Sequence, residues 1–555
     1  MEFTLDEELL QTAEVVVFRG ELRLRSRRCA ANLIYPPSYA ADGHPLVVAP
    51  ELPVGRHKSP EGQLCLDHPV FGRTQPMSGA EAVARAERLW DLWVNDPEML
   101  RVEEADAPDP AANYYVYAPG SAVTMIDANL GDGTRGFFDL AANSLVPLHG
   151  ALTSVRVTHP APVRISPPPG VAVLSGSIDL TGAWVRVSEP PPFTTLELRA
   201  WIDQHHKLFT DRQLDYAREQ AKANRRPGTP ALVAFVYPDE GPGRDETHDA
   251  WLFVAIDPDT GNGHLARSFH LRSDERWLRQ PQLKALAGNR VAIIGAGALG
   301  SQIAGLLARA GIGRMLLADG DLVTHGNRVR HELDLTDIGR QKVDALQGRL
   351  LAVNPWIEVA PLYGRVGGAT FGPAEGLGQR QDDIVFEGLQ EMDLIVNATA
   401  DAVAGNYISA LGVEAGKPVL HVWVSAGAWG ARLLIQRPGR SGCWSCLASF
   451  QEAGTLEQGR PLVPSIAEDP EVREVSERGC ADPSFTGPGF ELAAAASAAS
   501  RIAVQLLLQD AGAYPPADFD LATLNFRDEI RARPSTEYSR LPVHPECLFC
   551  NPPGS

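Results

Sequence analysis

The chain of 555 residues is long enough for roughly two to four domains. Its net charge of −19 argues against general binding to nucleic acids or to anionic membranes, because phosphate groups select basic surfaces. It has no apolar run of about 18 residues, the length that crosses a bilayer, and its N-terminal MEFTLDEELLQ lacks the apolar segment of a signal peptide. We therefore expect a cytoplasmic protein with neither a nucleic-acid nor a membrane partner.

Four of the seven cysteines form two Cys-x-x-Cys pairs. In a reducing compartment such pairs are typical of metal or redox sites, not of structural disulfides. Cys29 lies in an alternating, strand-like stretch, so we expect it to be a small buried hydrophobic residue. The other two, Cys65 and Cys480, lie in irregular, loop-like segments.

Residues 1–110 are predicted to form an α+β unit. A short helix over 6–12 leads into three short antiparallel strands, with Pro36-Pro37 as one of the turns between them. An irregular segment follows the strands. Residues 79–94 then carry apolar side chains at helical spacing, which indicates an amphipathic helix.

This order of elements resembles the core of a ubiquitin-conjugating enzyme. The resemblance lies in Tyr35-Pro36, in the segment GQLCL at 62–66 and in the aromatic-rich helix. It implies that Cys65 carries a modifier protein as a thioester, a task that suits a strongly nucleophilic thiolate. The alternative is that Cys65 is a packed loop cysteine in a degenerate conjugating fold.

One motif departs from the pattern of conjugating enzymes. Their usual His-Pro-Asn is replaced here by His57-Lys58-Ser59. The asparagine of that family helps to stabilise an oxyanion during transfer. This role is therefore unassigned in the present chain, with Lys58 and Ser59 as its two possible substitutes.

Residues 111–280 are predicted to form a β-rich middle region. Many short β-like runs extend to residue 187, one helix is expected over 194–224, and further strands are expected over 231–237 and 250–256. Two adjacent histidines in the helix do not form a metal pair, because neighbouring helical side chains point about 100° apart. We expect this region to pack between the flanking units and assign it no chemistry.

Residues 281–555 open with a strand–helix–strand pattern. An apolar strand runs into a turn with Gly295, Gly297 and Gly300, a helix follows, and a second apolar strand ends on Asp319. Glycines let the backbone approach a phosphate, and the N-terminus of the helix offers free N–H groups. The turn alone is equally consistent with an NAD-binding domain.

The polar residues after the second strand favour ATP chemistry over dinucleotide binding. Asp319 is followed by Asp321, Asn327, Arg330 and Lys342. A dehydrogenase needs one acid for the ribose and no cationic cluster just beyond it. An enzyme that activates a carboxylate with ATP needs such a cluster, because charge develops on the β- and γ-phosphates as pyrophosphate leaves, and Arg and Lys stabilise that charge.

These motifs resemble the family that includes ubiquitin-activating enzymes and the adenylyltransferases of the molybdopterin and thiamine pathways. GxGxxG, D-x-D, N-x-x-R and D-I-G-x-x-K occur in the family's order and spacing, and the resemblance extends over residues 285–550. It implies that Asp319 holds the ribose hydroxyls of ATP. Asn327, Arg330 and Lys342 would hold the phosphates.

Two further residues take their expected roles from the same resemblance. Asp401 ends the segment VNATAD, which follows an apolar strand, and it is implied as a ligand of Mg²⁺. An arginine that reaches across a homodimer is usual in the family, and Arg272 lies at a plausible distance upstream.

The two Cys-x-x-Cys pairs are predicted to form one tetrahedral Zn²⁺ site. They consist of Cys443 with Cys446 and Cys547 with Cys550. The pairs are too far apart in the chain for a small zinc ribbon, and they suit a staple that pins the C-terminal tail to the sheet. The alternative is two redox pairs. Zinc is favoured because neither pair opens a thioredoxin-like βα unit, and four thiolates would leave no open position for catalysis.

Cys480 lies between the two pairs, in the loop sequence SERGCADPSFTGPGFE before an Ala-rich helix predicted over 491–509. In the adenylating family a crossover loop between the zinc pairs bears the cysteine that accepts the activated C-terminus. The order here is the same, so the resemblance implies that role for Cys480. The alternative is an incidental loop cysteine.

Together these features predict an α/β chain of three parts. A Rossmann-like adenylation domain with a C-terminal zinc site over 281–555 follows the ubiquitin-conjugating-like α+β domain and the β-rich region. The resemblance implies a bacterial ubiquitination-like enzyme, of a kind sometimes linked to phage defence. It would use ATP and Mg²⁺ to activate the Gly-ended tail of a ubiquitin-like protein, pass it from Cys480 to Cys65 and conjugate it to a target amine. A homodimer and a companion deconjugating protease are also implied.

Two alternatives stay open. In the first, the chain adenylates a sulfur-carrier protein, and its N-terminal domain only docks a partner. In the second, it is a non-catalytic scaffold that binds a ubiquitin-like tail. The set of Asp319, Arg330 and Lys342 argues against the scaffold, since a pure binder has no need to clamp phosphates.

Overall fold

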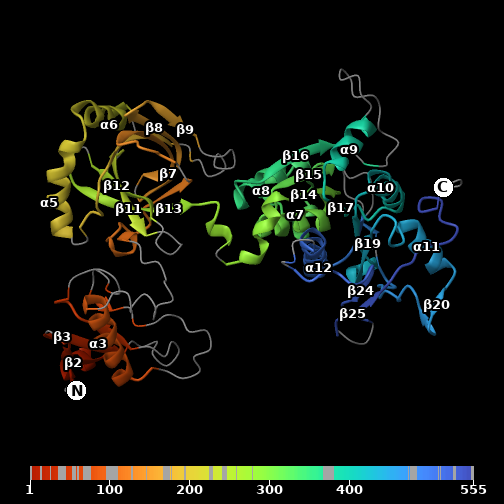
Figure 1. Cartoon of the computed structure of the whole chain (residues 1–555), viewed down its shortest axis with the longest axis horizontal. Coiled ribbons are helices and arrows are strands. Elements are labelled where there is room, and N and C mark those ends of the chain that lie inside the picture. Colours follow the sequence, from red (N-terminus) through yellow and green to blue (C-terminus); the bar gives the residue numbers. More distant parts are fainter. Residues whose placement is uncertain are drawn as a thin grey trace. The chain divides into compact units, whose positions relative to one another are not determined.

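The chain divides into two compact units, one made of Met1–Pro167 with Leu174–Arg272 and the other of Pro168–Val173 with Ser273–Ser555. Figure 1 traces both units in the computed structural model. The expected boundaries near residues 110 and 280 stay predictions. The structure describes residues 3–12, 15–25, 27–35, 45–52, 58, 62–64, 66, 77–95, 111–126, 129–145, 147–166, 176, 178–192, 195–223, 229–240, 247–257, 259–277, 279–364, 366, 381–472, 474–475, 484–509, 512, 514–528 and 533–551.

The first unit begins with a small antiparallel sheet and two helices. Its strands follow one another in the sheet: β1 (Thr4–Leu5), β2 (Val16–Arg23), β3 (Arg28–Tyr35), β4 (Leu46–Val48) and β5 (Gln63–Leu64). The helices are α1 (Glu7–Thr12) and α3 (Gly79–Asn95), and both confirm predicted helices. Cys29 is 1% exposed in the core between the sheet and α3, as expected of a small hydrophobic residue.

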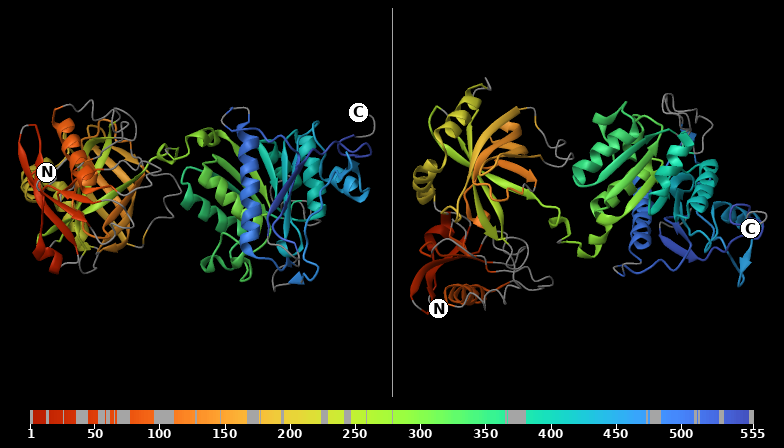
Figure 2. Two further views of the ribbon diagram at one scale, coloured as in Figure 1. Left: turned by 90° about the horizontal axis from the view of Figure 1, so that it is seen from below. Right: turned by 45° about the horizontal axis from the view of Figure 1, so that its top comes forward.

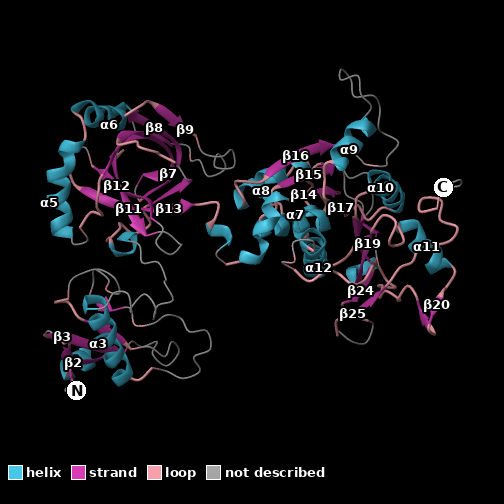
Figure 3. Ribbon diagram, in the orientation of Figure 1, coloured by secondary structure: helices cyan, strands magenta, loops and turns pink. Residues whose placement is uncertain are grey.

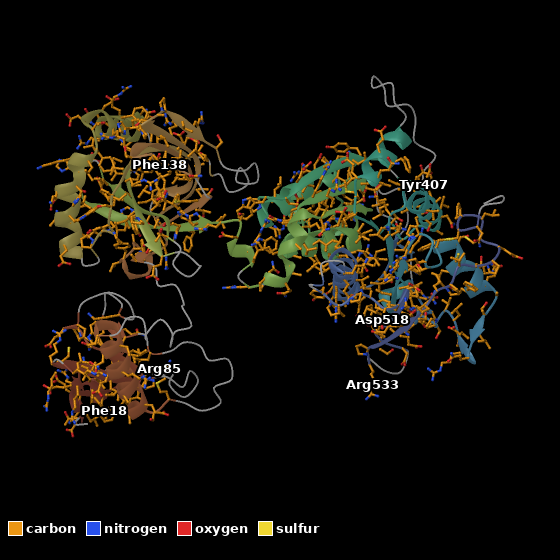
Figure 4. The ribbon with its side chains drawn as sticks, in the orientation of Figure 1. Phe18, Arg85, Phe138, Tyr407, Asp518 and Arg533 are labelled. Atoms are coloured by element: carbon orange, nitrogen blue, oxygen red, sulfur yellow. The ribbon has the colours of Figure 1, made fainter. Side chains whose placement is uncertain are left out.

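The β-rich region forms a barrel that its sequence did not reveal. Its strands are β6 (Ala122–Ile126), β7 (Arg135–Leu145), β8 (Leu148–His159), β9 (Val163–Ile165), β10 (Ile178–Arg186), β11 (Ala231–Glu240), β12 (Thr247–Ile256) and β13 (Gly263–Leu271). Strand β6 pairs with both β13 and β8, and this double pairing closes the sheet. Aromatic side chains fill the interior, among them Trp184, Trp251 and Phe138. Phe138 is labelled in Figure 4.

The single helix predicted over 194–224 is wrong. The structure has α5 (Thr195–His205) and α6 (Asp211–Ala223), with a short 3₁₀ turn between them, and α6 packs on the outside of the barrel at β10 and β11 (Figure 3). The break has a local cause. Thr210 and Gln213 form a reciprocal capping box, in which the Gln213 amide donates to Thr210 Oγ1 at 3.3 Å and the Thr210 amide donates to Gln213 Oε1 at 3.1 Å.

The second unit is built on an eight-stranded sheet in the order β16-β15-β14-β17-β18-β19-β24-β25. The strands are β14 (Arg290–Ile294), β15 (Arg314–Asp319), β16 (Glu358–Tyr363), β17 (Leu394–Asn397), β18 (Val419–Val424), β19 (Gly430–Gln436), β24 (Leu521–Asn525) and β25 (Ser535–Ser539). The first five in this order are parallel and the last three antiparallel. The parallel part has the predicted Rossmann-like pattern.

Helices cover both faces of this sheet. One face carries α7 (Ala298–Ala310), α8 (Lys342–Val353) and α12 (Gly489–Leu508), and the other carries α9 (Gln381–Gln390) and α10 (Ala402–Ala415). The remaining elements are α11 (Trp444–Glu452) and four short strands, β20 (Leu456–Glu457), β21 (Arg460–Pro461), β22 (Glu474–Val475) and β23 (Ser484–Phe485). Chain order reverses direction in the sheet between β14 and β17, which is where α/β sheets bind ligands.

Helix α12 confirms the Ala-rich helix predicted over 491–509. It lies along α7 (Figure 2), where small residues such as Ala495, Ala499 and Ala503 are fully buried. By length and composition it is the one helix in the described part of the chain that is apolar enough to cross a membrane. Its burial against α7 and β18 accounts for that composition, because a helix that is apolar on most sides belongs in a core.

Candidate functional site

Three glycines shape the turn between β14 and α7, and each has a different role. Gly295 has φ +90°, and an added Cβ would lie 2.9 Å from the backbone of Ala398 and Thr399. At Gly300 an added Cβ would lie 1.8 Å from the carbonyl oxygen of Gly295, so only glycine lets α7 pack this closely. At Gly297 an added Cβ would meet no described atom within 4 Å, which leaves this backbone open to a ligand.

Asp319, at the end of β15, ties the glycine turn to the next strand. Its Oδ2 accepts the amide N–H of Ala296 at 2.8 Å, and its Oδ1 accepts that of Asp321 at 2.8 Å. Burial raises the pKa of Asp319, while the charge of Lys342 and these two hydrogen bonds oppose the shift. Each carboxylate oxygen keeps a further lone pair for a ligand hydroxyl, so the geometry is compatible with the implied ribose contact.

Lys342 is buried beside an acid at the same edge. Its Nζ lies 2.9 Å from Asp321 Oδ2, and its side chain is 7% exposed. The amide N–H of Lys342 also donates to the carbonyl of Asp321 at 3.0 Å, so the start of α8 is fastened to the segment after β15. A nearly buried ammonium that is already oriented by an acid is compatible with the predicted role of Lys342 as a phosphate-binding cation.

The Asn327–Arg330 segment is fixed against α7. Asn327 Oδ1 accepts the amide of Thr324 at 3.0 Å, and the amide of Arg330 donates to the Asn327 carbonyl at 3.0 Å. Gln302, on α7, donates from Nε2 to the carbonyl of Arg330 at 2.9 Å. The predicted phosphate-binding residues therefore follow β15 and sit beside the helix that starts at the glycine turn.

The D-I-G-x-x-K motif is shaped by the side chain of Asp337 and by the turn at Gly339. Asp337 is 9% exposed, accepts the amide of Asp334 at 3.2 Å and pairs with Arg340 at 2.7 Å. Gly339 adopts φ +84° in the turn that follows. The motif thus sets the path of the chain into Lys342.

His331 is a site residue that the sequence analysis missed. Its Nε2 lies 2.6 Å from the carbonyl of Ala296 in the glycine turn, and its Nδ1 accepts the amide of Leu333 at 3.3 Å. Burial lowers the pKa of His331 to about 4, so it is neutral, with its proton on Nε2. Its only signal in the sequence is its position directly after Arg330.

Asp401 follows β17 and caps α10, with Oδ1 accepting the amide of Ala404 at 2.8 Å. Because Gly295 approaches Ala398 and Thr399, the glycine turn and the turn before Asp401 lie side by side. The predicted nucleotide residues of this unit therefore gather at the carboxyl edge of β14, β15 and β17. Arg272 is the last residue of the first unit, and its role across a dimer stays a prediction.

The four paired cysteines come together in space. Their Sγ atoms lie within 4.8 Å of one another, with neighbours such as Cys443 and Cys547 at 3.5 Å and Cys446 and Cys550 at 3.9 Å. Zinc–sulfur bonds of about 2.3 Å in a tetrahedron place sulfur atoms about 3.8 Å apart. These separations fit a Zn²⁺ site and are too long for disulfides. The amide of His544 donates to Cys446 Sγ at 3.3 Å, as thiolate ligands often require.

Cys480 and Cys65 lie outside the described residues, as does His57. The flanks of the Cys480 segment are described. Strands β22 and β23 pair with each other on either side of residues 476–483. An added Cβ at Gly487 would lie 3.0 Å from Ala428, just past β18, and one at Gly489 would lie 2.6 Å from the carbonyl of Val329. Residues 487–489 therefore lie beside the edge that carries the predicted nucleotide residues.

Lys58 has a structural role in the described part of the N-terminal unit. It is 3% exposed, its Nζ donates to the carbonyls of Pro50 and Leu52, and its backbone bridges to Leu64. Burial lowers the pKa of this ammonium. Of the two possible substitutes for the missing asparagine, Lys58 is thus already engaged by loop carbonyls, and Ser59 lies outside the described residues.

Comparison with known proteins agrees with this geometry. Residues 272–540 match the ThiF family. The chain is 26% identical to the uncharacterized protein y4oA of Sinorhizobium fredii over 91% of this chain and 86% of the relative. It is 26% identical to the ATP-dependent ubiquitin transferase-like protein Cap2 of Pseudomonas aeruginosa, over 35% of this chain and 34% of the relative.

A third relative is the sulfur carrier protein ThiS adenylyltransferase of Escherichia coli, 31% identical over 29% of this chain and 59% of the relative. The chain thus spans about a third of Cap2 and under two thirds of the ThiS enzyme. The matched family, the parallel sheet and the converging nucleotide residues lead to one conclusion. The C-terminal unit is similar in sequence to the ThiF family over residues 272–540, and it has a ThiF-like α/β fold.

Proposed function

We propose that the chain activates the C-terminal glycine of a ubiquitin-like protein and conjugates it. The glycine carboxylate attacks the α-phosphorus of ATP, the bond to the β-phosphate oxygen breaks, and pyrophosphate leaves. The thiolate of Cys480 attacks the acyl carbon of the adenylate, and AMP leaves. Cys65 takes the acyl group by thioester exchange, and a target amine finally receives it as an amide while the Cys65 thiol is released.

Side chains at the carboxyl edge of the sheet supply what the first step needs. Lys342, Arg330 and Asn327 are proposed to hold the β- and γ-phosphates, where charge develops as pyrophosphate departs. Asp319 is proposed to hold the ribose hydroxyls. The open backbone at Gly297 and the first turn of α7 are suited to the α-phosphate.

One observation carries the proposal. The predicted nucleotide residues, which come from separate segments of the chain, gather at one sheet edge, and Gly487 and Gly489 lie close to Gly427 and Val329 at that edge. The described residues a few positions after Cys480 thus lie beside the proposed site of the acyl-adenylate, which supports Cys480 as its acceptor. This arrangement favours thioester formation over adenylation alone.

Two metal ions have proposed places. Asp401 is the proposed ligand of Mg²⁺, which would neutralise phosphate charge when bound. The four cysteines would hold Zn²⁺ as a structural staple between α11 and the C-terminal tail, since four thiolates leave no open coordination position.

The biological setting follows from the relatives and stays a proposal. Likeness to Cap2 supports a bacterial ubiquitination-like system. A cytoplasmic location is part of the proposal. A homodimer with Arg272 crossing to the other subunit, a companion deconjugating protease and a link to phage defence belong to the same proposal. The resemblance of the N-terminal unit to conjugating enzymes supports the role of Cys65.

Likeness to the ThiS adenylyltransferase supports a second candidate function. In it the acyl-adenylate of a sulfur-carrier protein is converted to a thiocarboxylate, and the N-terminal unit only docks a partner. Replacing Cys65 would then leave product formation intact. A pure scaffold is disfavoured, because a binder has no use for a buried lysine that faces a nucleotide edge.

The adenylation step is tested by exchange of labelled pyrophosphate into ATP, with the small Gly-tailed partner present. Lys342→Ala should lower the exchange rate by about 100-fold or more, since it removes a preorganised cation from the departing phosphates. Lys284→Ala, which alters an exposed lysine of the same unit, is the matched control and should exchange like wild type. Equal rates in the two variants would contradict the assignment of Lys342.

A further inference from the structure

A cluster of four polar side chains is buried behind β17 and β18. It consists of Asn397, Ser409, His421 and Gln436, and none of them is more than 2% exposed. Polar groups in such a core are costly unless they satisfy one another. These four do so, and the cluster also reaches outward in two directions.

One end of the cluster sets the turn that leads to Asp401. Asn397 Oδ1 accepts the amide N–H of Thr399 at 3.2 Å and its hydroxyl at 2.8 Å. Thr399 Oγ1 in turn accepts the amide of Asp401 at 3.4 Å. The other side of the Asn397 amide donates from Nδ2 to His421 Nδ1 at 3.0 Å.

The other end reaches the cysteine cluster. Ser409 Oγ donates to Gln436 Oε1 at 2.8 Å and accepts the amide N–H of Trp444 at 3.2 Å. Trp444 directly follows Cys443, and its ring lies 5.3 Å from that of His421. His421 Nε2 lies 3.2 Å from Gln436 Oε1, which closes the network between the two ends.

The network has one self-consistent set of donors and acceptors. Because Asn397 Oδ1 faces two donors, its Nδ2 must donate to His421, and His421 must be neutral with its proton on Nε2. Turning the Asn397 amide would place its N–H group against the backbone N–H of Thr399, which can only donate. If a side chain at either end of the network moves, a flip of the Asn397 amide therefore cannot restore the hydrogen bonds.

We propose that this network couples metal occupancy of the four-cysteine site to nucleotide binding at the Asp401 turn, with Ser409 and His421 as positioning residues. A bound metal fixes Cys443 and hence the amide of Trp444, which orients Ser409. Ser409 orients Gln436 and His421, and through Asn397 they hold the Thr399–Asp401 backbone. The inference rests on the function proposed above, because it assumes that Asp401 serves a bound nucleotide.

A four-state comparison tests the coupling. The affinity for the fluorescent analogue mant-ATP with Mg²⁺ is measured for zinc-loaded and chelator-stripped protein, in wild type and in Ser409→Ala. Stripping should weaken binding by wild type about fivefold or more. Zinc-loaded Ser409→Ala should already bind the nucleotide about as weakly as stripped wild type. Removing its metal should weaken binding little further.

Ser500→Ala is the matched control. Ser500 is also a buried helical serine, in α12, and its hydroxyl donates to the Ala496 carbonyl at 2.8 Å, outside the network. This variant should behave as wild type does in both metal states. Equal weakening by metal removal in wild type and Ser409→Ala would overturn the inference.

A reciprocal measurement needs only loaded protein. Saturating nucleotide should slow transfer of zinc to a chromophoric chelator in wild type and in Ser500→Ala, and not in Ser409→Ala, because coupling acts equally in both directions. Thr399→Val cuts the same network at its nucleotide end and should also lose the effect, whereas Thr399→Ser keeps the hydroxyl and should retain it. The inference is contradicted if nucleotide fails to slow zinc transfer in both Thr399 variants, or if it slows transfer in both.

The two proposals fail in different ways. If loaded wild-type protein does not bind nucleotide at all, the proposed adenylation is wrong. If it binds nucleotide with an affinity that neither metal nor Ser409 alters, adenylation stands and only the coupling is refuted.

Discussion

Lys342 and Asp319 show how single residues shape the sheet edge at which we propose that the nucleotide binds. Lys342 is almost fully buried beside Asp321, so its charge is aimed and partly desolvated without help from a ligand. Asp319 uses both carboxylate oxygens to hold backbone amides of the glycine turn and of the segment after β15. Both residues therefore support the fold and also face the proposed ATP site, so their replacement affects stability as well as activity.

His331 should make stability depend on pH. Its pKa in the folded protein is about 4, against an ordinary value of about 6.5, so the unfolded chain takes up a proton that the folded chain refuses. As the pH falls from 6.5 to 4, protonation of His331 in the unfolded chain therefore lowers the free energy of unfolding by about 3 kcal/mol in total. Above pH 6.5 this loss is absent. Urea unfolding of His331→Gln between pH 7 and pH 5 should show a shallower loss of stability than wild type.

His325→Gln is the control for this measurement, because His325 is an exposed histidine of the same segment. It should keep the wild-type dependence on pH. A steep, wild-type-like decline in His331→Gln would show that His331 is not the neutral, buried group described here.

At the level of elements, the shape of the carboxyl edge of β14, β15 and β17 depends on how closely α7 and the turn before α10 approach β14. Glycine is required at two of the three turn positions for different reasons, a positive φ at Gly295 and close packing at Gly300. The third, Gly297, faces open space. Elsewhere in the same unit, the cysteine cluster joins α11 to the tail after β25.

Alanine substitutions should separate these roles. Gly300→Ala should destabilise the unit by about 2 kcal/mol or more, because its Cβ meets the Gly295 carbonyl. Gly297→Ala should fold normally and weaken ATP binding. Gly348→Ala, within α8 and with no described atom within 4 Å of its Cβ, should stabilise by about 0.5–1 kcal/mol. Thermal unfolding and nucleotide titration of the three variants check these outcomes, and a normally folded, ATP-binding Gly300→Ala would contradict the packing argument.

Metal removal should release the C-terminal tail. Cys547→Ser takes away one of four thiolates, so the variant should lose bound zinc. Its free energy of unfolding should fall by on the order of several kcal/mol, and proteases should cleave the tail more readily. Metal content by mass spectrometry and limited proteolysis measure both effects. Ser445→Ala, a change within the same Cys-x-x-Cys segment, should retain one zinc per chain. Wild-type protein without zinc but with Cys443–Cys446 disulfides would instead favour the redox alternative.

At the level of the whole molecule, a ThiF-like unit shares a chain with a β-barrel and a small antiparallel sheet. Features whose chemistry depends on local spacing were predictable, such as the glycine turn, Lys342 and the two cysteine pairs. Features that depend on distant contacts were not. Pairing of β6 with both β8 and β13 closes the barrel, and the Asn397–His421–Ser409 network joins segments whose sequence shows no relation.

Smaller misses have similar causes. The helix break at Thr210 arises from a capping box inside an otherwise helical pattern. His331 carries no spacing signal, because its role is to hold the carbonyl of Ala296, a residue far from it in the chain. The roles of Cys65 and Cys480 were inferred from family resemblance and stay predictions.

The most direct test of the acyl relay is a non-reducing gel after incubation of the protein with ATP, Mg²⁺ and a small ubiquitin-like protein that ends in glycine. Wild type should form adducts that thiol reductants cleave. Cys480→Ala should form none, and Cys65→Ala should accumulate the adduct on Cys480 without passing it to a target. Cys29→Ala is the matched cysteine control and should form adducts as wild type does. An adduct that survives both Cys480→Ala and Cys65→Ala would contradict the relay.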